Sequence, residues 1–116
     1  MTYTTYRILK LDALECASLE DYIAECGGVC PYYWYTSDGS AGTVIAGLTA
    51  IWNIAHGNGF NTLLELTGLG NVAFSRNFGM PLRTVENWKG GVSAPPVWVL
   101  EYVEMAVVDF IIGGGR

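Results

Sequence analysis

The sequence predicts an α+β fold that is mostly α-helical, in which a short strand and one short helix precede a bundle of four to five helices. Residues 3–11 are rich in Tyr, Thr and Ile and alternate loosely, which is typical of a strand. From residue 43 onward, apolar residues recur at helical spacing, and glycines separate the helical segments. We therefore expect a small N-terminal module over residues 1–42 and a helical domain over residues 43–116.

The N-terminal module is expected to continue with a helix and an aromatic connector. The helix begins after Ser18, with two acids in its first turn, and ends at the glycine pair 27–28. The connector over residues 29–42 carries an aromatic run at 32–35 and an Asp-Gly turn signal at 38–39, which favours a hairpin. The aromatic run has two interpretations: a partner surface or a lid on the small core.

The second part of the chain is expected to form helices separated by glycine. Thr43 is the expected N-cap of the first of them. Pro95 and Pro96 stand at the start of the last one, where a missing N–H costs little. On that last helix, Glu101 and Asp109 are expected off the apolar stripe and Glu104 at its border. The expected helices are one after Thr43 that ends at the glycines 57–59, one from Phe60 to Gly68, Asn71–Phe78, residues 81–89 and residues 97–111.

The composition excludes several classes of protein. Of the 116 residues, 51% are apolar and only 15% are charged, which permits a packed core and excludes a disordered chain. The chain has no uninterrupted apolar run of about 18 residues for a membrane span. The first residues do not have the pattern of a secretory signal. We therefore expect a cytoplasmic protein with no membrane partner.

The cysteines and the single histidine predict neither catalysis nor metal binding. Cys16, Cys26 and Cys30 cannot all pair within one chain, so free thiols in a reducing compartment are expected. A zinc site would need paired ligand spacing, which these residues and His56 do not provide. His56 lies beside a helix end, where it is expected to interact with the helix dipole. The sequence thus indicates no enzyme and no cofactor.

The net charge of −5 is spread unevenly along the chain. Residues 1–58 carry two cations and six acids, for a net charge of −4. Residues 59–96 carry three cations and two acids, for a net charge of +1, and residues 97–116 carry one cation and three acids, for −2. The middle segment is therefore the part that a polyanion would repel least.

The same middle segment has the pattern of two short helices joined by a tight turn. Phe78 closes the first helix with an inward-facing ring, and Gly79 supplies the turn, where a positive φ is easily adopted. Pro81 then sets the first turn of the second helix. Val85 and Trp88, three residues apart, are expected to anchor that helix to the core. This arrangement is a helix-turn-helix.

The motifs of this segment resemble those of a known family. The chain reads LTGL at 66–69, FSRNFG at 74–79, RTVENW at 83–88 and PPVWV at 95–99. On these motifs, residues 60–107 resemble the lambda-repressor-like helix-turn-helix family, in particular its small members in Firmicutes and their mobile elements. The first 40 residues resemble no family.

The resemblance implies contacts with DNA from the start of the first helix of the pair and from the exposed face of the second. By position, these contacts would come from Asn71, Pro81, Leu82, Arg83, Thr84, Asn87 and Lys89. Arg83 is expected to pair with a guanine and Asn87 with an adenine. Asn71, Thr84 and Lys89 are expected to contact phosphates, which fix the register on the duplex.

Three features depart from the family pattern. Gly70 and Asn71 stand where Ser-Gln is usual, and Lys89 stands where an acid usually follows the tryptophan. Glu86 adds an anion to the surface that is expected to face DNA. Because the segment has only three cations, a monomer is expected to bind weakly. A homodimer on a palindromic site is therefore expected.

The resemblance implies a small sequence-specific DNA-binding transcriptional regulator of a phage or mobile element. The Arg83, Thr84 and Asn87 face favours this function. The acidic front half and the aromatic run favour an alternative, a protein-binding inhibitor, such as an anti-CRISPR or anti-defence protein, built on a helix-turn-helix scaffold. In that case the N-terminal module would bind the partner protein. A helix-turn-helix antitoxin would combine both binding modes.

Overall fold

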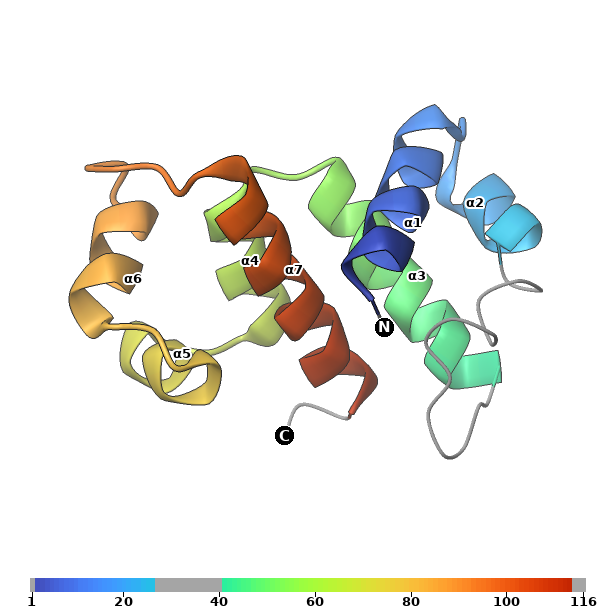
Figure 1. Cartoon of the computed structure of the whole chain (residues 1–116). Helices are drawn as coiled ribbons and strands as arrows, with labels where there is room; N and C mark the ends of the chain where they lie inside the picture. Colours follow the sequence, from blue (N-terminus) through green and yellow to red (C-terminus); the bar gives the residue numbers. More distant parts are fainter. Residues whose placement is uncertain (1, 27–40, 114–116) are drawn as a thin grey trace.

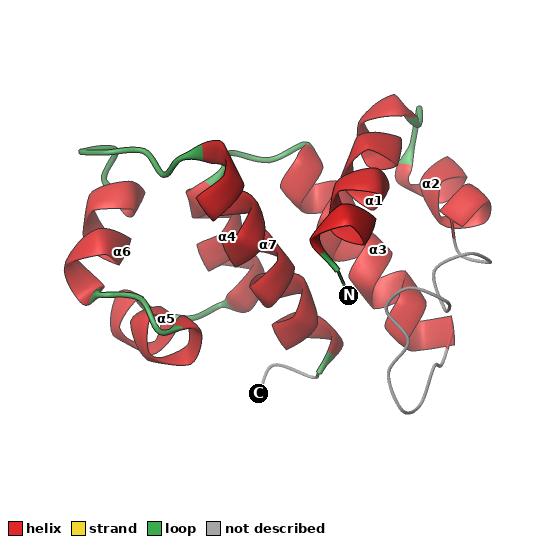
Figure 2. Ribbon diagram, viewed as in Figure 1, coloured by secondary structure: helices red, strands yellow, loops and turns green. Residues whose placement is uncertain are grey.

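Seven helices make up the part of the chain that the structure, a computed structural model, describes: residues 2–26 and 41–113 (Figure 1). Within these residues there is no strand (Figure 2). The helices are α1 (Tyr3–Glu15), α2 (Leu19–Cys26), α3 (Ala41–Ala55), α4 (Phe60–Thr67), α5 (Asn71–Phe78), α6 (Leu82–Lys89) and α7 (Val97–Ile112). No helix in the described residues is both long and apolar enough to span a bilayer.

The strand predicted over residues 3–11 is wrong, because these residues belong to α1. The side chain of Thr2 caps the helix by accepting a hydrogen bond from the N–H of Thr5 at 3.1 Å. Tyr6, Leu9 and Ala13 then follow at helical spacing and are all buried. Packing of this face overrides the strand preference of the Tyr and Thr residues. The α+β part of the predicted fold class is therefore not supported.

Most helix boundaries follow the predicted signals. The Ser18 hydroxyl accepts a hydrogen bond from the N–H of Asp21 at the start of α2, and Gly68 ends α4 in the left-handed conformation with φ of 66°. Thr43, however, is not an N-cap, since α3 begins two residues earlier at Ala41. The first turn of the helix accommodates Gly42, because glycine inside a helix lowers helix stability by only about 1 kcal/mol relative to alanine. The hairpin predicted at 38–39, the aromatic run at 32–35 and Cys30 lie outside the described residues.

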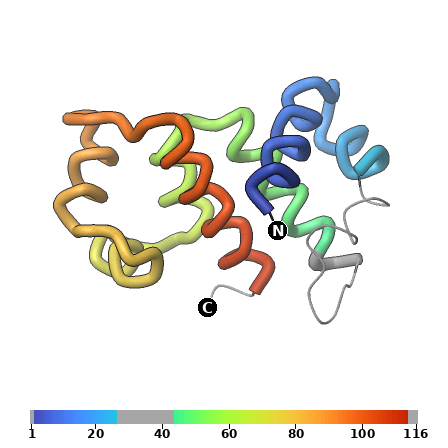
Figure 3. The backbone as a smooth tube through the Cα atoms, viewed as in Figure 1, coloured from blue at the N-terminus to red at the C-terminus, as the bar shows by residue number. Residues whose placement is uncertain are grey.

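Buried residues from all seven helices belong to one apolar cluster. Helix α7 lies between the two ends of the molecule, in contact with α3 on one side and α4 on the other (Figure 3). Helices α1 and α2 pack against α3, so the N-terminal helices share this core. Helices α5 and α6 lie at the opposite end of the molecule from α2 (Figure 1).

Two acids of α7 are buried in the contact with α1, contrary to their predicted place off or beside the apolar stripe. Glu101 is 5% exposed and Glu104 is 2% exposed. The hydroxyl of Tyr3 donates to Glu101 Oε1 at 2.6 Å, and the hydroxyl of Tyr6 donates to Glu104 Oε1 at 2.8 Å. Lys10 Nζ lies 2.9 Å from Glu104 Oε1. These partners compensate the cost of burying the two carboxylates.

Candidate nucleic-acid interface

A closed turn joins α5 to α6. Gly79 ends α5 in the left-handed conformation, with φ of 63°. The carbonyl of Ser75 accepts a hydrogen bond from the N–H of Met80 at 3.0 Å, and the Ser75 hydroxyl donates to the Met80 carbonyl. Pro81 follows as the N-cap of α6. The direction in which α6 leaves the turn is therefore fixed by backbone hydrogen bonds and by proline.

One side of α6 packs against an aromatic cluster. Val85 is completely buried, and the ring of Trp88 meets the ring of Phe60 edge-on, with centroids 5.4 Å apart. Phe60 also meets Phe74 edge-on at 5.3 Å, and Phe74 lies 4.5 Å from Phe78 on α5. The anchoring roles predicted for Val85 and Trp88 agree with this packing. The cluster holds α4, α5 and α6 as one unit.

The opposite side of α6 is open to solvent. Leu82, Arg83, Glu86 and Lys89 are all exposed. Successive residues of a helix are rotated by about 100°, so Glu86 lies near the centre of this exposed face. Thr84 and Asn87 are half-buried and lie at the edge between the exposed and the packed sides.

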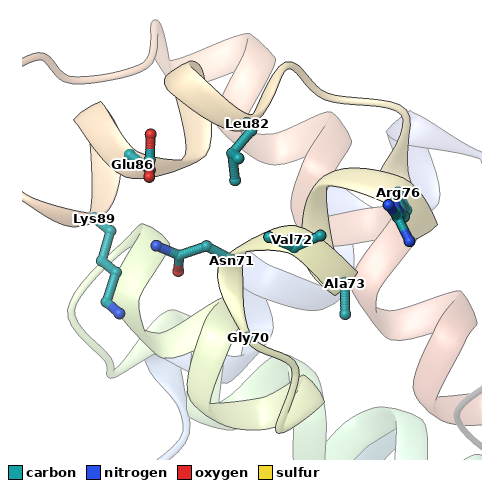
Figure 4. Close-up of a pocket in the computed structure, with 8 residues that line it drawn as sticks. All are labelled: Gly70, Asn71, Val72, Ala73, Arg76, Leu82, Glu86 and Lys89. Atoms are coloured by element: carbon teal, nitrogen blue, oxygen red, sulfur yellow. The ribbon is translucent and has the colours of Figure 1, made fainter.

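A groove between α5 and α6 collects part of the predicted site (Figure 4). From α6, Leu82, Glu86 and Lys89 line it; from the other side come the first turn of α5 and Arg76. Of the seven predicted contact residues, Asn71, Leu82 and Lys89 lie together in this groove. Pro81 and Arg83 are exposed outside it. The groove is lined by Gly70, Asn71, Val72, Ala73, Arg76, Leu82, Glu86 and Lys89.

Sequence reasoning missed three members of this groove, Val72, Ala73 and Arg76. Val72 is 50% exposed although it is apolar. Arg76 follows Val72 by four residues on α5, a spacing that places two side chains on the same helix face. This i, i+4 spacing could have predicted Val72 and Arg76, because Val72 follows Asn71 in the first turn of the helix and Arg76 lies one turn later on the same face.

The charged groups are separated along the molecule. The cations of α1 form ion pairs with the buried acids of α7. Arg7 Nε lies 3.9 Å and Lys10 Nζ lies 3.8 Å from Glu101 Oε2. Within the described residues, no ion pair engages the three cations of the opposite end, which are Arg76, Arg83 and Lys89. The exposed acids of α2 lie far from them (Figure 1). The α5–α6 end is thus where uncommitted positive charge gathers.

The cysteines and the histidine of the described residues form hydrogen bonds within the protein. Cys16 and Cys26 are free thiols, and burial is the main cause that raises the pKa of Cys26 to about 11. His56 Nε2 lies 3.0 Å from the carbonyl oxygen of Ala13 and therefore donates to it, which ties the end of α3 to α1. Among the described residues, no group of three His, Cys, Asp or Glu side chains could hold a metal ion.

The comparisons with known proteins found no relative: no family model, no curated protein and no solved structure matches the chain. The likeness of residues 60–107 to lambda-repressor-like proteins therefore depends on the motifs alone. What the described geometry adds is the arrangement of α5, the turn and α6 on the surface.

Proposed function

We propose that the protein binds double-stranded DNA sequence-specifically through α6 and acts as a small transcriptional regulator of a phage or mobile element. The observation that carries the proposal is the exposed face of α6, at the end of the molecule and covered by no described element (Figure 1). An α-helix with its side chains is about 10–12 Å wide. It therefore fits the major groove of B-DNA, which is about 12 Å wide.

The distribution of charge supports this orientation toward DNA. The uncommitted cations Arg76, Arg83 and Lys89 belong to α5 and α6, and the exposed acids of α2 lie at the far end. A polyanion approaching the molecule is therefore attracted to the α5–α6 end and repelled from the other end. Charge steering of this kind weakens as salt is added.

The proposed contacts divide into base readers and phosphate contacts. Arg83, exposed on α6, would bind the O6 and N7 atoms of a guanine, and Asn87, at the edge of the exposed face, would bind an adenine. Asn71 and Lys89, which face each other across the groove, would contact phosphates (Figure 4). Exposed Pro81 and half-buried Thr84, which lie outside the groove, would complete the backbone contacts.

Two copies of the chain would act together on DNA. Because a monomer has only three such cations, its electrostatic attraction to the duplex is weak. Helix α7 exposes Val97, Trp98 and Tyr102, the last two by 62% and 53%. A large exposed apolar surface is a common place for a second copy, so substitution of Trp98 by Glu should lower the oligomeric state measured by sedimentation velocity.

The proposal is tested by titrating labelled duplexes and following fluorescence anisotropy at two salt concentrations. Duplexes selected by the protein from a random library serve as the sites. With Arg83→Ala, we expect a loss of about 10–100-fold in affinity for a selected site and a smaller loss for random duplex, because one cation is removed along with the base contact. With Lys89→Ala, we expect equal weakening on all duplexes and a shallower salt dependence, because a phosphate contact is lost.

The matched control is Arg7→Ala, which removes the same charge from α1, away from the groove. Arg7 is engaged with Glu101, so its loss should leave DNA binding unchanged. Absence of binding at low salt would contradict the proposal, as would equal effects of the Arg7 and Arg83 substitutions.

A second candidate, a protein-binding inhibitor on a helix-turn-helix scaffold, is favoured by one observation. Helix α2 exposes Glu20, Asp21 and Glu25 at the end of the molecule opposite α6. Replacing these three acids by their amides should abolish capture of a partner protein and leave DNA binding unchanged if this candidate holds. Capture that survives the triple substitution would count against it.

A further inference from the structure

A carboxylate lies at the centre of the face through which α6 is proposed to bind DNA. Glu86 is exposed, and it shares the groove with Leu82 one turn before it and Lys89 three residues after it (Figure 4). Arg83 precedes it by three residues on the same exposed face. In the described part of the chain, Glu86 has neither an ion pair nor a side-chain hydrogen bond.

Because of this position, a duplex that lies on α6 contacts Glu86. A duplex that contacts both Arg83 and Lys89 must also meet the residue between them. A carboxylate in the major groove is repelled by the phosphates and loses its hydration, and both effects cost free energy unless the carboxylate accepts a hydrogen bond. The chain thus carries an acid where general affinity for DNA would favour a neutral or basic residue.

The major groove offers a carboxylate two kinds of donor, the N4 amino group of cytosine and the N6 amino group of adenine. Adenine also presents its N7 acceptor next to N6, which repels a carboxylate. Cytosine presents only the donor on its own edge. We propose that Glu86 is a specificity-determining residue that accepts a hydrogen bond from the N4 amino group of a cytosine, an inference that rests on the proposed DNA-binding function.

The side chains next to Glu86 indicate which bases would lie next to the cytosine. Arg83 and Glu86 are three residues apart, which is about 4.5 Å along the helix axis and somewhat more than one base-pair step of about 3.4 Å. The guanine bound by Arg83 and the cytosine bound by Glu86 therefore lie in neighbouring base pairs. Leu82, 37% exposed, and Val72, 50% exposed, present apolar surface suited to a thymine methyl group.

The test uses the full chain and duplexes selected from a random library. Glu86→Ala removes both acceptor oxygens, and the isosteric Glu86→Gln removes the charge but keeps one acceptor. We expect wild-type protein to prefer cytosine about tenfold or more at one position, and Glu86→Ala to lose that preference while it retains the preference for the guanine. We also expect Glu86→Gln to bind random duplex more tightly, because one negative charge is removed. Replacing the selected cytosine by 2-pyrimidinone, which lacks the amino group, should weaken wild-type binding and leave the binding of Glu86→Ala unaffected.

The matched control is Glu65→Gln, which removes the same charge from an exposed position on α4 outside the groove. It should keep every base preference. If wild-type protein binds no duplex, or prefers no sequence, the proposed function fails, and this inference fails with it. If wild-type protein has a sequence preference that Arg83→Ala abolishes but Glu86→Ala and 2-pyrimidinone leave intact, the inference alone is overturned.

Discussion

Substitution of Tyr6 by Phe removes one hydroxyl group from the most buried polar contact between α1 and α7. The ring of Tyr6 is completely buried, and its hydroxyl donates to Glu104 Oε1 at 2.8 Å. Because phenylalanine keeps the ring, the loss is that of a hydrogen bond to a charged group, about 1.5–3 kcal/mol. Lys10 continues to bind the same oxygen at 2.9 Å, which keeps the carboxylate partnered. We expect the free energy of unfolding to fall by about 2 kcal/mol.

Urea unfolding followed by circular dichroism measures this change. For a chain of this length, about 2 kcal/mol corresponds to a decrease in Tm of about 8 °C. The matched control is Tyr102→Phe, since Tyr102 is 53% exposed and its hydroxyl has no hydrogen bond within the described residues. The control should change stability by less than about 0.5 kcal/mol. Equal stability of the Tyr6 variant and wild type would refute the assigned role of the buried acids.

Three further outcomes follow from the structure. Gly57→Ala should destabilise the protein by about 1–3 kcal/mol, because a Cβ there would lie 2.6 Å from the carbonyl oxygen of Asn53, whereas Gly70→Ala, with open space around it, should be nearly neutral in the same urea titration. The pKa of the Cys26 thiol is raised from 9.0 to about 11. At pH 8 this thiol should therefore react with iodoacetamide about a hundredfold more slowly in the folded than in the unfolded protein, as measured by peptide mass spectrometry. Equal rates would contradict the burial of Cys26. Burial raises the pKa of Tyr6 above its ordinary value of 10.0, so its contribution to stability is complete below pH 10 and is lost as the pH rises further; wild-type protein should lose more stability than Tyr6→Phe between pH 10 and 11, and parallel pH profiles would be the contrary result.

The helix pair α5–α6 could be predicted because its signals are local. Gly79 has the positive φ that the turn requires, and Val85 and Trp88 are both on the packed side of α6. Each of these features depends on residues within one or two turns of the chain. Local spacing also explains why the bounds of α5 were predicted correctly and those of α6 to within one residue.

The N-terminal helix and the buried acids could not be predicted in this way. Strand preference is a property of each residue alone, whereas the helical burial of Tyr6 depends on α3 and α7, which come much later in the chain. The partners of Glu101 and Glu104 are separated from them by 91 to 98 residues. No spacing rule within α7 gives the position of those partners, so the sequence pattern alone predicts Glu101 off the apolar stripe and Glu104 at its border.

The position of Glu86 could be predicted from the sequence only in part. Its exposure was expected from the helix pattern, but its place in one groove with Asn71 and Lys89 depends on how α5 and α6 pack. The half-burial of Thr84 and Asn87 depends on the same packing. Helix periodicity gives the face of a residue, and tertiary structure decides which residues of two helices meet.

The account depends most directly on which residues touch DNA. A titration of isotope-labelled protein with a selected duplex, followed by backbone amide chemical shifts, locates that contact residue by residue. We expect the largest changes in residues 70–76 and 81–90, on α5 and α6, with α1 and α2 unchanged. Changes confined to α1 and α2, or no changes at low salt, would contradict the assignment of α6 as the helix that reads DNA.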